Sequence, residues 1–208
     1  RRSPEHLINA GRVTSKIIDP QMKNELYHKI AQKTFPTNHL GHAERIALLI
    51  TDSRLKNMAL KIIAKKNVAL YLSSDMEARI QDAIRIANTL VTNNSIKQTI
   101  LNDVTNAYIK KDKLEKALST ANKIQSSYAR DLAYGLIAQK ATSNKTYLKA
   151  YKTISKISKP SKRLGLYIKV TCKMLFFGLF KAVSFPFKLT YWGFYYLLAP
   201  SRALFRRG

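Results

Sequence analysis

Acidic residues are missing from the last third of this 208-residue chain, because Asp131 is the final Asp or Glu in the sequence. The 77 residues after Asp131 contain 15 Lys and Arg, whereas residues 1–131 contain 22 basic and 12 acidic residues. The C-terminal part therefore contributes +15 of the formal net charge of +25. A segment with charge of one sign favours an anionic partner, such as a membrane surface or nucleic acid.

Cysteine, glycine and proline are also scarce. A single cysteine, Cys172, excludes a disulfide within the chain. The 7 Gly and 6 Pro are few, and the abundant Ala, Leu, Lys and Gln favour helix. An apolar content of 46% is enough to form a buried core. The composition therefore predicts an all-α protein with one ordinary domain and an appendage.

The motifs of the common enzyme classes are absent as well. The sequence has no glycine-rich phosphate loop and no nucleophile elbow. His39 and His42 have a spacing compatible with metal binding, but no cysteine or carboxylate pair accompanies them. We therefore predict no enzymatic activity, no cofactor and no metal site.

The sequence contains an internal repeat. Apolar anchor residues follow one another at spacings of 33, 40, 34 and 33, namely Ile17, Ile50, Leu90, Ile124 and Ile157. Thirteen and fourteen positions after each anchor stand Ile30-Ala31, Ile63-Ala64, Asp103-Val104, Ile137-Ala138 and Val170-Thr171. The third copy breaks the pattern at one position. A repeat of this length indicates one helical hairpin per copy, which buries its apolar face only by stacking on its neighbours.

The fourth copy predicts both helices of its hairpin. Its first helix has apolar residues on one face at Leu114, Ala117, Leu118, Ala121 and Ile124. Its second helix repeats the pattern at Leu132, Ala133, Leu136, Ile137 and Ala141. We expect these faces to be buried, with the small Ala residues allowing close helix packing.

The segment Lys111–Leu118 and the period of about 34 resemble the tetratricopeptide (TPR)-like family of helical repeats, over residues 5–160. The Trp, Leu-Gly and Pro signature positions of that family are missing here. The resemblance implies a right-handed α-solenoid of four to five hairpins, with a concave surface for a protein or peptide ligand and no catalytic residues. We place a domain boundary near Pro160, between a repeat domain (1–160) and a C-terminal segment (161–208).

A run of basic residues precedes this boundary. The helical spacing places five of them on one predicted helix face, and two more extend the cluster; this basic run comprises Lys145, Lys149, Lys152, Lys156, Lys159, Lys162 and Arg163. Glu and Asp are absent between them, which is unusual for a solvated face. The basic run is therefore a candidate site for anionic lipid headgroups or for a phosphate backbone.

The C-terminal segment has the pattern of an amphipathic membrane helix. We predict a helix over residues 165–184 that is broadly apolar, with Leu166, Val170 and Leu175 on its apolar face. Aromatic residues follow Pro186, and basic residues end the segment. The predicted membrane-binding residues are Lys169, Lys173, Lys181, Phe185, Lys188, Tyr191, Trp192, Tyr195, Arg202, Arg206 and Arg207.

Three placements of this segment stay open. Spanning a bilayer is disfavoured because Lys181 and Lys188 each cost about 2.5–3.5 kcal/mol at the bilayer centre. An in-plane helix avoids that cost. The segment could instead cap the open end of the solenoid through its Phe residues, although solenoid caps usually have a polar outer face.

The sequence thus predicts a cytoplasmic, peripheral membrane protein that acts as a non-enzymatic interaction scaffold and is tethered to an anionic membrane by its C-terminal segment. One alternative is a nucleic-acid-binding helical-repeat protein that uses the basic run. Another is a secreted effector of an intracellular bacterium whose C-terminal segment inserts into a host membrane, since the Lys-, Ile- and Asn-rich composition indicates an AT-rich genome.

Overall fold

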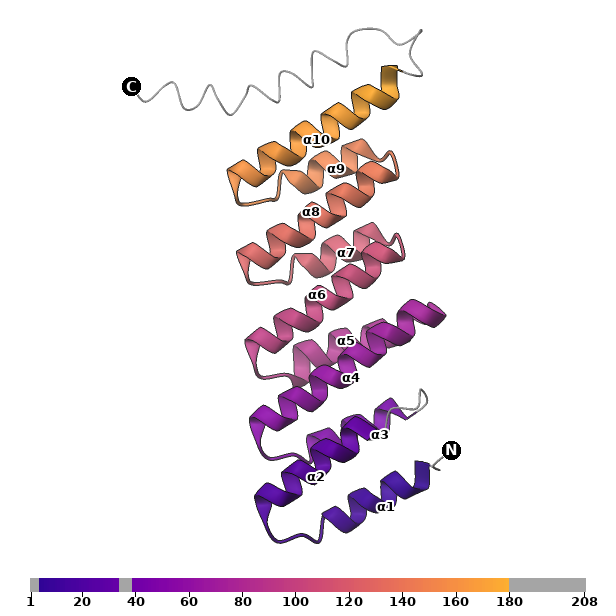
Figure 1. Ribbon diagram of the computed structural model, residues 1–208, viewed down its shortest axis with the longest axis vertical. Helices are drawn as coiled ribbons and strands as arrows, with labels where there is room; N and C mark the ends of the chain where they lie inside the picture. The colour runs from indigo at the N-terminus through magenta and orange to yellow at the C-terminus, as the bar shows by residue number, and fades with distance from the viewer. Residues whose placement is uncertain (1–3, 34–38, 180–208) are drawn as a thin grey trace, which may run out of the picture. The chain divides into compact units, whose positions relative to one another are not determined.

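The computed structural model describes residues 4–33 and 39–179, and this part of the chain is all-α (Figure 1). It contains ten α-helices, a five-residue π-helical turn (Ile86–Leu90) and no strand. The helices are α1 (Pro4–Thr14), α2 (Pro20–Lys33), α3 (Leu40–Leu48), α4 (Ser53–Ser74), α5 (Glu77–Arg85), α6 (Asn94–Lys110), α7 (Leu114–Ala121), α8 (Ser127–Ser143), α9 (Tyr147–Ile154) and α10 (Pro160–Leu179). The predicted fold class is therefore confirmed at the level of an all-α protein.

Short and long helices alternate from α3 onward, and local signals set their ends. Asp52 and Asn93 cap α4 and α6, because their side chains accept hydrogen bonds from the N–H groups of Leu55 (2.7 Å) and Ile96 (3.1 Å). Pro160 is the first residue of α10, a position where proline needs no N–H partner. Pro160 therefore begins a helix.

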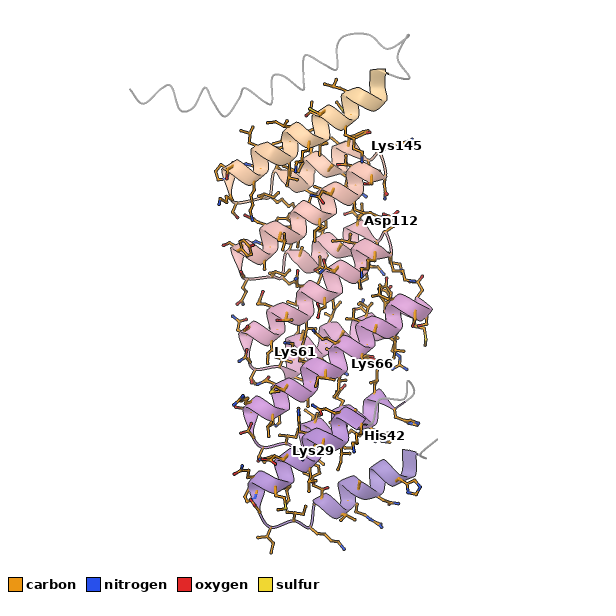
Figure 2. All side chains as sticks on the ribbon, viewed as in Figure 1. Lys29, His42, Lys61, Lys66, Asp112 and Lys145 are labelled. Carbon is orange, nitrogen blue, oxygen red and sulfur yellow. The ribbon has the colours of Figure 1, made fainter. Side chains whose placement is uncertain are left out.

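The turns that follow the long helices α4, α6 and α8 each use a residue with left-handed backbone geometry. Asp75 follows α4 with φ of 57°, Asp112 follows α6 with φ of 61°, and Lys145 follows α8 with φ of 60°. Figure 2 shows Asp112 and Lys145 at these turns. Asp tolerates this geometry better than most residues, whereas Lys adopts it less often. Recurrence at three turns indicates that the helical pairs share one local design.

Alanine marks the buried contacts that recur along the chain. Ala43, Ala83, Ala117 and Ala150 are fully buried on the short helices α3, α5, α7 and α9. Ala31, Ala64 and Ala138 are fully buried on the long helices α2, α4 and α8. A methyl side chain lets helix backbones approach closely, so any larger residue at these positions overpacks the core.

The chain forms two compact units, residues 1–129 and 130–208. In the first unit, α4 packs against the long helices α2 and α6 and against the short helices α3 and α5 that precede and follow it in the chain. In the second unit, α9 packs against α10, and Leu166 of α10 lies beside Gly135 of α8. The predicted boundary near Pro160 coincides with the start of α10 and stays a prediction.

The third anchor of the repeat is Val91, and the predicted anchor Leu90 is wrong. Val91 is 8% exposed, whereas Leu90 is only half-buried within the π-helical turn. That turn holds one extra residue, so it shifts the anchor by one position. Counted from Val91, the pair thirteen and fourteen positions later is Val104-Thr105, both fully buried, which restores the pattern of the other copies.

Candidate functional site

The basic run does not lie on one helix, which corrects the prediction. Helix α9 ends at Ile154, so only Lys149 and Lys152 share a helix face. Lys145 precedes α9 at the left-handed turn (Figure 2), and Lys156 and Lys159 follow α9 on the way to α10. Lys162 and Arg163 stand in the first turn of α10. The helix ends early because Ile157 turns back into the core, where it is 1% exposed.

Asp131, the last acidic residue of the chain, is buried and holds the segment between α9 and α10 in place. Its side chain is 6% exposed, and its two carboxylate oxygens accept hydrogen bonds from the N–H groups of Ser158 (2.9 Å) and Lys159 (3.1 Å). A carboxylate that accepts two backbone N–H bonds is satisfied within the protein. The only acid of residues 130–208 is thus turned inward, and no acidic group lies on the described surface of this unit.

The same position in three earlier long helices carries a polar side chain with the same role. Asn24, Asn57 and Gln98 are each the fifth residue of their helix, as Asp131 is of α8. They accept hydrogen bonds from the backbone N–H groups of Thr51 (2.8 Å), Thr92 (3.0 Å) and Gln125 (2.7 Å), in the loop that follows the next short helix. We call these four residues loop clamps. The sequence prediction missed them because it followed only apolar residues.

The fifth residue of α10 breaks this series, since it is Leu164. This side chain is 48% exposed, and Ile168 (47%) and Leu175 (37%) are exposed on the same side of α10. At about 100° per residue, the three lie within roughly 40° of one another around the helix axis. We call Leu164, Ile168 and Leu175 the apolar stripe.

The predicted apolar membrane face of this helix is partly wrong. Val170 is 3% exposed and Leu166 is half-buried, so both point toward the interior of their unit, whereas Leu175 is exposed as expected. Lys169 and Lys173 are exposed on α10. The predicted residues Lys181, Phe185, Lys188, Tyr191, Trp192, Tyr195, Arg202, Arg206 and Arg207 lie outside the described residues.

Helix α10 is fixed on α9 by aromatic contacts. The Tyr151 and Tyr167 rings stack with centroids 5.7 Å apart, and the hydroxyl groups of Tyr151 and Thr171 are 2.8 Å apart. Burial raises the pKa of Tyr167 above its ordinary value. These contacts hold the inner side of α10 and leave its outer side to solvent.

Helix α8 also exposes residues that the sequence pattern assigned to the core. Leu132 is 46% and Leu136 is 37% exposed, whereas Ala133, Ile137 and Ala141 of the same helix are buried. The apolar pattern of α8 is wider than the side that its neighbours cover. The outer side of α8 therefore includes exposed aliphatic residues, and this second unit combines exposed aliphatic groups with exposed cations.

The first unit has a different polar cluster, centred on Glu77 at the start of α5. Its carboxylate accepts hydrogen bonds from Lys116 Nζ (2.7 Å), the Tyr108 hydroxyl (3.0 Å) and Lys113 Nζ (3.3 Å). Burial alone would raise the pKa of Glu77, but bonds from Lys116, Tyr108, Gln81 and Lys113 lower it to about 2. Lys113 also lies 5.1 Å from the centre of the Tyr71 ring. This cluster joins α5 to α6 and α7.

The histidines and the cysteine form no such cluster. The His39 and His42 rings are 5.9 Å apart and tilted, and within residues 4–33 and 39–179 no three His, Cys, Asp or Glu side chains gather in a geometry that could hold a metal ion. Cys172 is exposed on α10 as a free thiol. None of the described helices is both long enough and apolar enough to cross a membrane.

No protein-family model matches this chain, and no curated protein or solved structure matches it either. The function is therefore argued from the residues themselves.

Proposed function

We propose that the protein is a non-enzymatic interaction scaffold, built as a right-handed α-solenoid and tethered to an anionic membrane by residues 130–208. The observation that carries the tether is the inward-facing Asp131. Because its carboxylate is buried and bonded to two backbone N–H groups, the described surface of its unit has basic residues without acidic ones. Such a surface attracts an anionic leaflet, with each Lys or Arg near it worth about 1 kcal/mol.

Three recurrences support the solenoid. Short and long helices alternate, the turns after α4, α6 and α8 each have a left-handed residue, and a loop clamp occupies the fifth position of four long helices. In the first unit, the long helix α4 contacts the long helices α2 and α6 as well as the short helices α3 and α5, which is typical of stacked hairpins. Solenoids of this kind present an extended surface, and we propose that this surface holds a protein or peptide partner.

The exposed aliphatic residues favour a membrane over nucleic acid. Nucleic acids offer phosphates and stacked bases, which bind Lys, Arg and aromatic rings. Leu132, Leu164 and Ile168 gain nothing from such a partner. The boundary between headgroups and acyl chains offers anionic charge and apolar volume together, which suits both classes of exposed side chain.

Co-sedimentation of the full chain with vesicles tests the tether. We expect binding to phosphatidylserine-containing vesicles, weak binding to phosphatidylcholine alone, and weaker binding as salt rises. The double variant Lys169→Gln/Lys173→Gln should lower the affinity roughly thirtyfold, since each lysine contributes about 1 kcal/mol. The matched control Lys29→Gln/Lys123→Gln removes two exposed lysines from the first unit and should change little.

A failure to bind anionic vesicles would end the membrane proposal. In that case, RNA binding measured across a salt series decides on the nucleic-acid alternative. A steep fall of affinity with salt, reduced by the Lys169→Gln/Lys173→Gln variant, would replace the membrane by RNA. A flat response would reject phosphate binding altogether.

A further inference from the structure

The apolar stripe of α10 occupies positions that are covered on the preceding long helix. Counting back 33 residues, Leu164, Ile168 and Leu175 correspond to Asp131, Gly135 and Thr142 of α8. All three are buried on α8. Asp131 is covered by the loop at Ser158, and Gly135 lies against Leu166, whose methyl carbon is 3.6 Å from where a Cβ would stand. On α10, no described residue covers the corresponding side.

The chemistry of these positions changes between the two helices. On α8 they are a hydrogen-bond acceptor, a residue without a side chain and a small hydroxyl residue, which suit a following loop and a closely packed helix. On α10 they are three large aliphatic side chains. If another repeat followed, its loop would have no hydrogen-bond acceptor at Leu164. Its helix could not pack as closely against Ile168 as α10 packs against Gly135. The apolar stripe is therefore not designed for the kind of helix that covers α8.

The exposed part of α10 that lies further around the helix from the apolar stripe is cationic. Lys169 and Lys173 are exposed further around α10, at roughly 100–180° from the stripe's residues. The only acidic residue of the unit is buried, so nothing on its described surface neutralises them. A helix that presents an aliphatic edge on one side and lysines further around its axis fits a surface that is anionic outside and apolar a few ångströms below.

We propose that the apolar stripe inserts into the headgroup boundary of an anionic bilayer, with α10 lying in the plane of the membrane and Lys169 and Lys173 at the phosphate level. This inference rests on the proposed membrane function and adds that the folded helix α10, rather than residues 180–208 alone, contacts lipid. Lipid chains in a fluid bilayer do not need a surface of complementary shape. The bilayer can therefore surround the large Leu and Ile side chains, which would hinder the packing of another repeat. The outer side of α8, with Leu132 and Leu136, presents further aliphatic surface in the same unit.

The first test changes the apolar stripe in the full chain. The variant Leu164→Gln/Ile168→Gln/Leu175→Gln keeps good helix formers on an exposed face, so helix content measured by circular dichroism should stay constant. We expect its affinity for phosphatidylserine-containing vesicles to fall on the order of thirtyfold, as three half-exposed aliphatic groups are no longer buried. The matched control Val13→Gln/Met22→Gln/Met58→Gln alters exposed apolar residues of the first unit and should bind like the unchanged chain.

The second test uses the only cysteine of the chain as a depth marker. Cys172 is exposed on α10, roughly 40–80° around the helix from the apolar stripe, so a fluorophore attached there reports contact with lipid directly. We expect nitroxide groups on the lipid chains to quench this fluorophore when vesicles are added. The variant Cys172→Ser/Lys29→Cys moves the label to α2 and should show no quenching.

The outcomes separate the two proposals. If the unchanged chain does not bind anionic vesicles, both the membrane function and this inference fail. If it binds, but the stripe variant binds equally well and the Cys172 label is not quenched, only this inference fails and lipid contact belongs elsewhere in the chain. If the stripe variant instead changes a self-associated state, seen by sedimentation velocity, while vesicle binding persists, the apolar stripe is a protein interface and the inference is overturned.

Discussion

In residues 1–129, acidic side chains reach from one helix to another and meet basic ones: Glu44 on α3 pairs with Arg85 on α5, and Glu77 on α5 pairs with Lys116 on α7. In residues 130–208, the one acidic side chain bonds to backbone N–H groups. The acidic side chains of the first unit therefore offset part of its basic charge through ion pairs between helices. The second unit contains no other Asp or Glu, so its own sequence offers no acidic side chain to offset the charge of the exposed Lys169 and Lys173.

The two units nevertheless share one structural device, the loop clamp. Asn24, Asn57 and Gln98 perform with neutral amides what Asp131 performs with a carboxylate. Both units therefore hold their loops in the same way, through a loop clamp. The contrast between them comes from their surface charges.

The largest expected effect comes from removing a loop clamp. Asp131→Ala leaves the N–H groups of Ser158 and Lys159 without their acceptor, which should lower the free energy of unfolding by about 2–3 kcal/mol. Asp131→Asn keeps one oxygen acceptor and should cost less. Urea denaturation measures the change, and amide hydrogen exchange at Ser158 and Lys159 shows whether it is local.

Asn57→Ala is the matching experiment in the first unit, and it should cost a similar amount because Thr92 N–H loses its acceptor. A negligible effect of Asp131→Ala together with a large effect of Asn57→Ala would show that the clamp is not shared.

A smaller effect is expected at Glu77 and depends on pH. Its pKa is about 2 in the folded chain against an ordinary 4.5, so the unfolded chain binds more protons between these values. The contribution of the ionised Glu77 carboxylate to the free energy of unfolding is therefore present above pH 4.5 and disappears as pH falls toward 2. Because the side chain is about one-third exposed, we expect about 1–2 kcal/mol at neutral pH.

Glu77→Gln should lower stability by that amount at neutral pH and by almost nothing near pH 2, as measured by thermal unfolding across pH. The control Glu25→Gln removes an exposed carboxylate on α2 and should cost little stability at neutral pH. A constant difference between Glu77→Gln and the unchanged chain at all pH values would mean that the ion pairs do not stabilise α5.

The smallest effect is expected at the pair Glu44–Arg85. Two hydrogen bonds of 2.7 and 2.9 Å join the guanidinium to the carboxylate, and the pKa of Arg85 is raised chiefly by its hydrogen bond to Glu44. Since Arg85 is partly exposed, Arg85→Gln should cost about 0.5–1 kcal/mol, less at high salt. Arg54→Gln is the control at an exposed arginine, and denaturation at two salt concentrations detects the difference. A cost that does not change with salt would contradict an ionic origin.

Much of the helical pattern could be predicted because it depends on local spacing. Ile50, Ile124 and Ile157 were predicted as anchors and are buried to 1% exposure or less. Leu90 was wrong because the π-helical turn inserts one residue, and no apolar spacing signals such an insertion. The basic run was wrong as a helix face because α9 ends where Ile157 enters the core, and helix ends depend on tertiary contacts as well as on propensity.

The sequence by itself determined the all-α class, the recurrence of buried Ala and Ile, and the loss of acidic residues after Asp131, since all three are properties of residue order. Only the tertiary structure decided which side of an apolar helix is covered. Ala133 and Leu132 are adjacent in the chain, yet one is buried and the other exposed, because only one side of α8 is covered in the folded chain. The tertiary structure also decided that Asp131 points inward, which leaves the second unit's described surface without an acid. The exposure of Leu164, Ile168 and Leu175 was likewise decided by the tertiary structure, because no described helix packs on that side of α10.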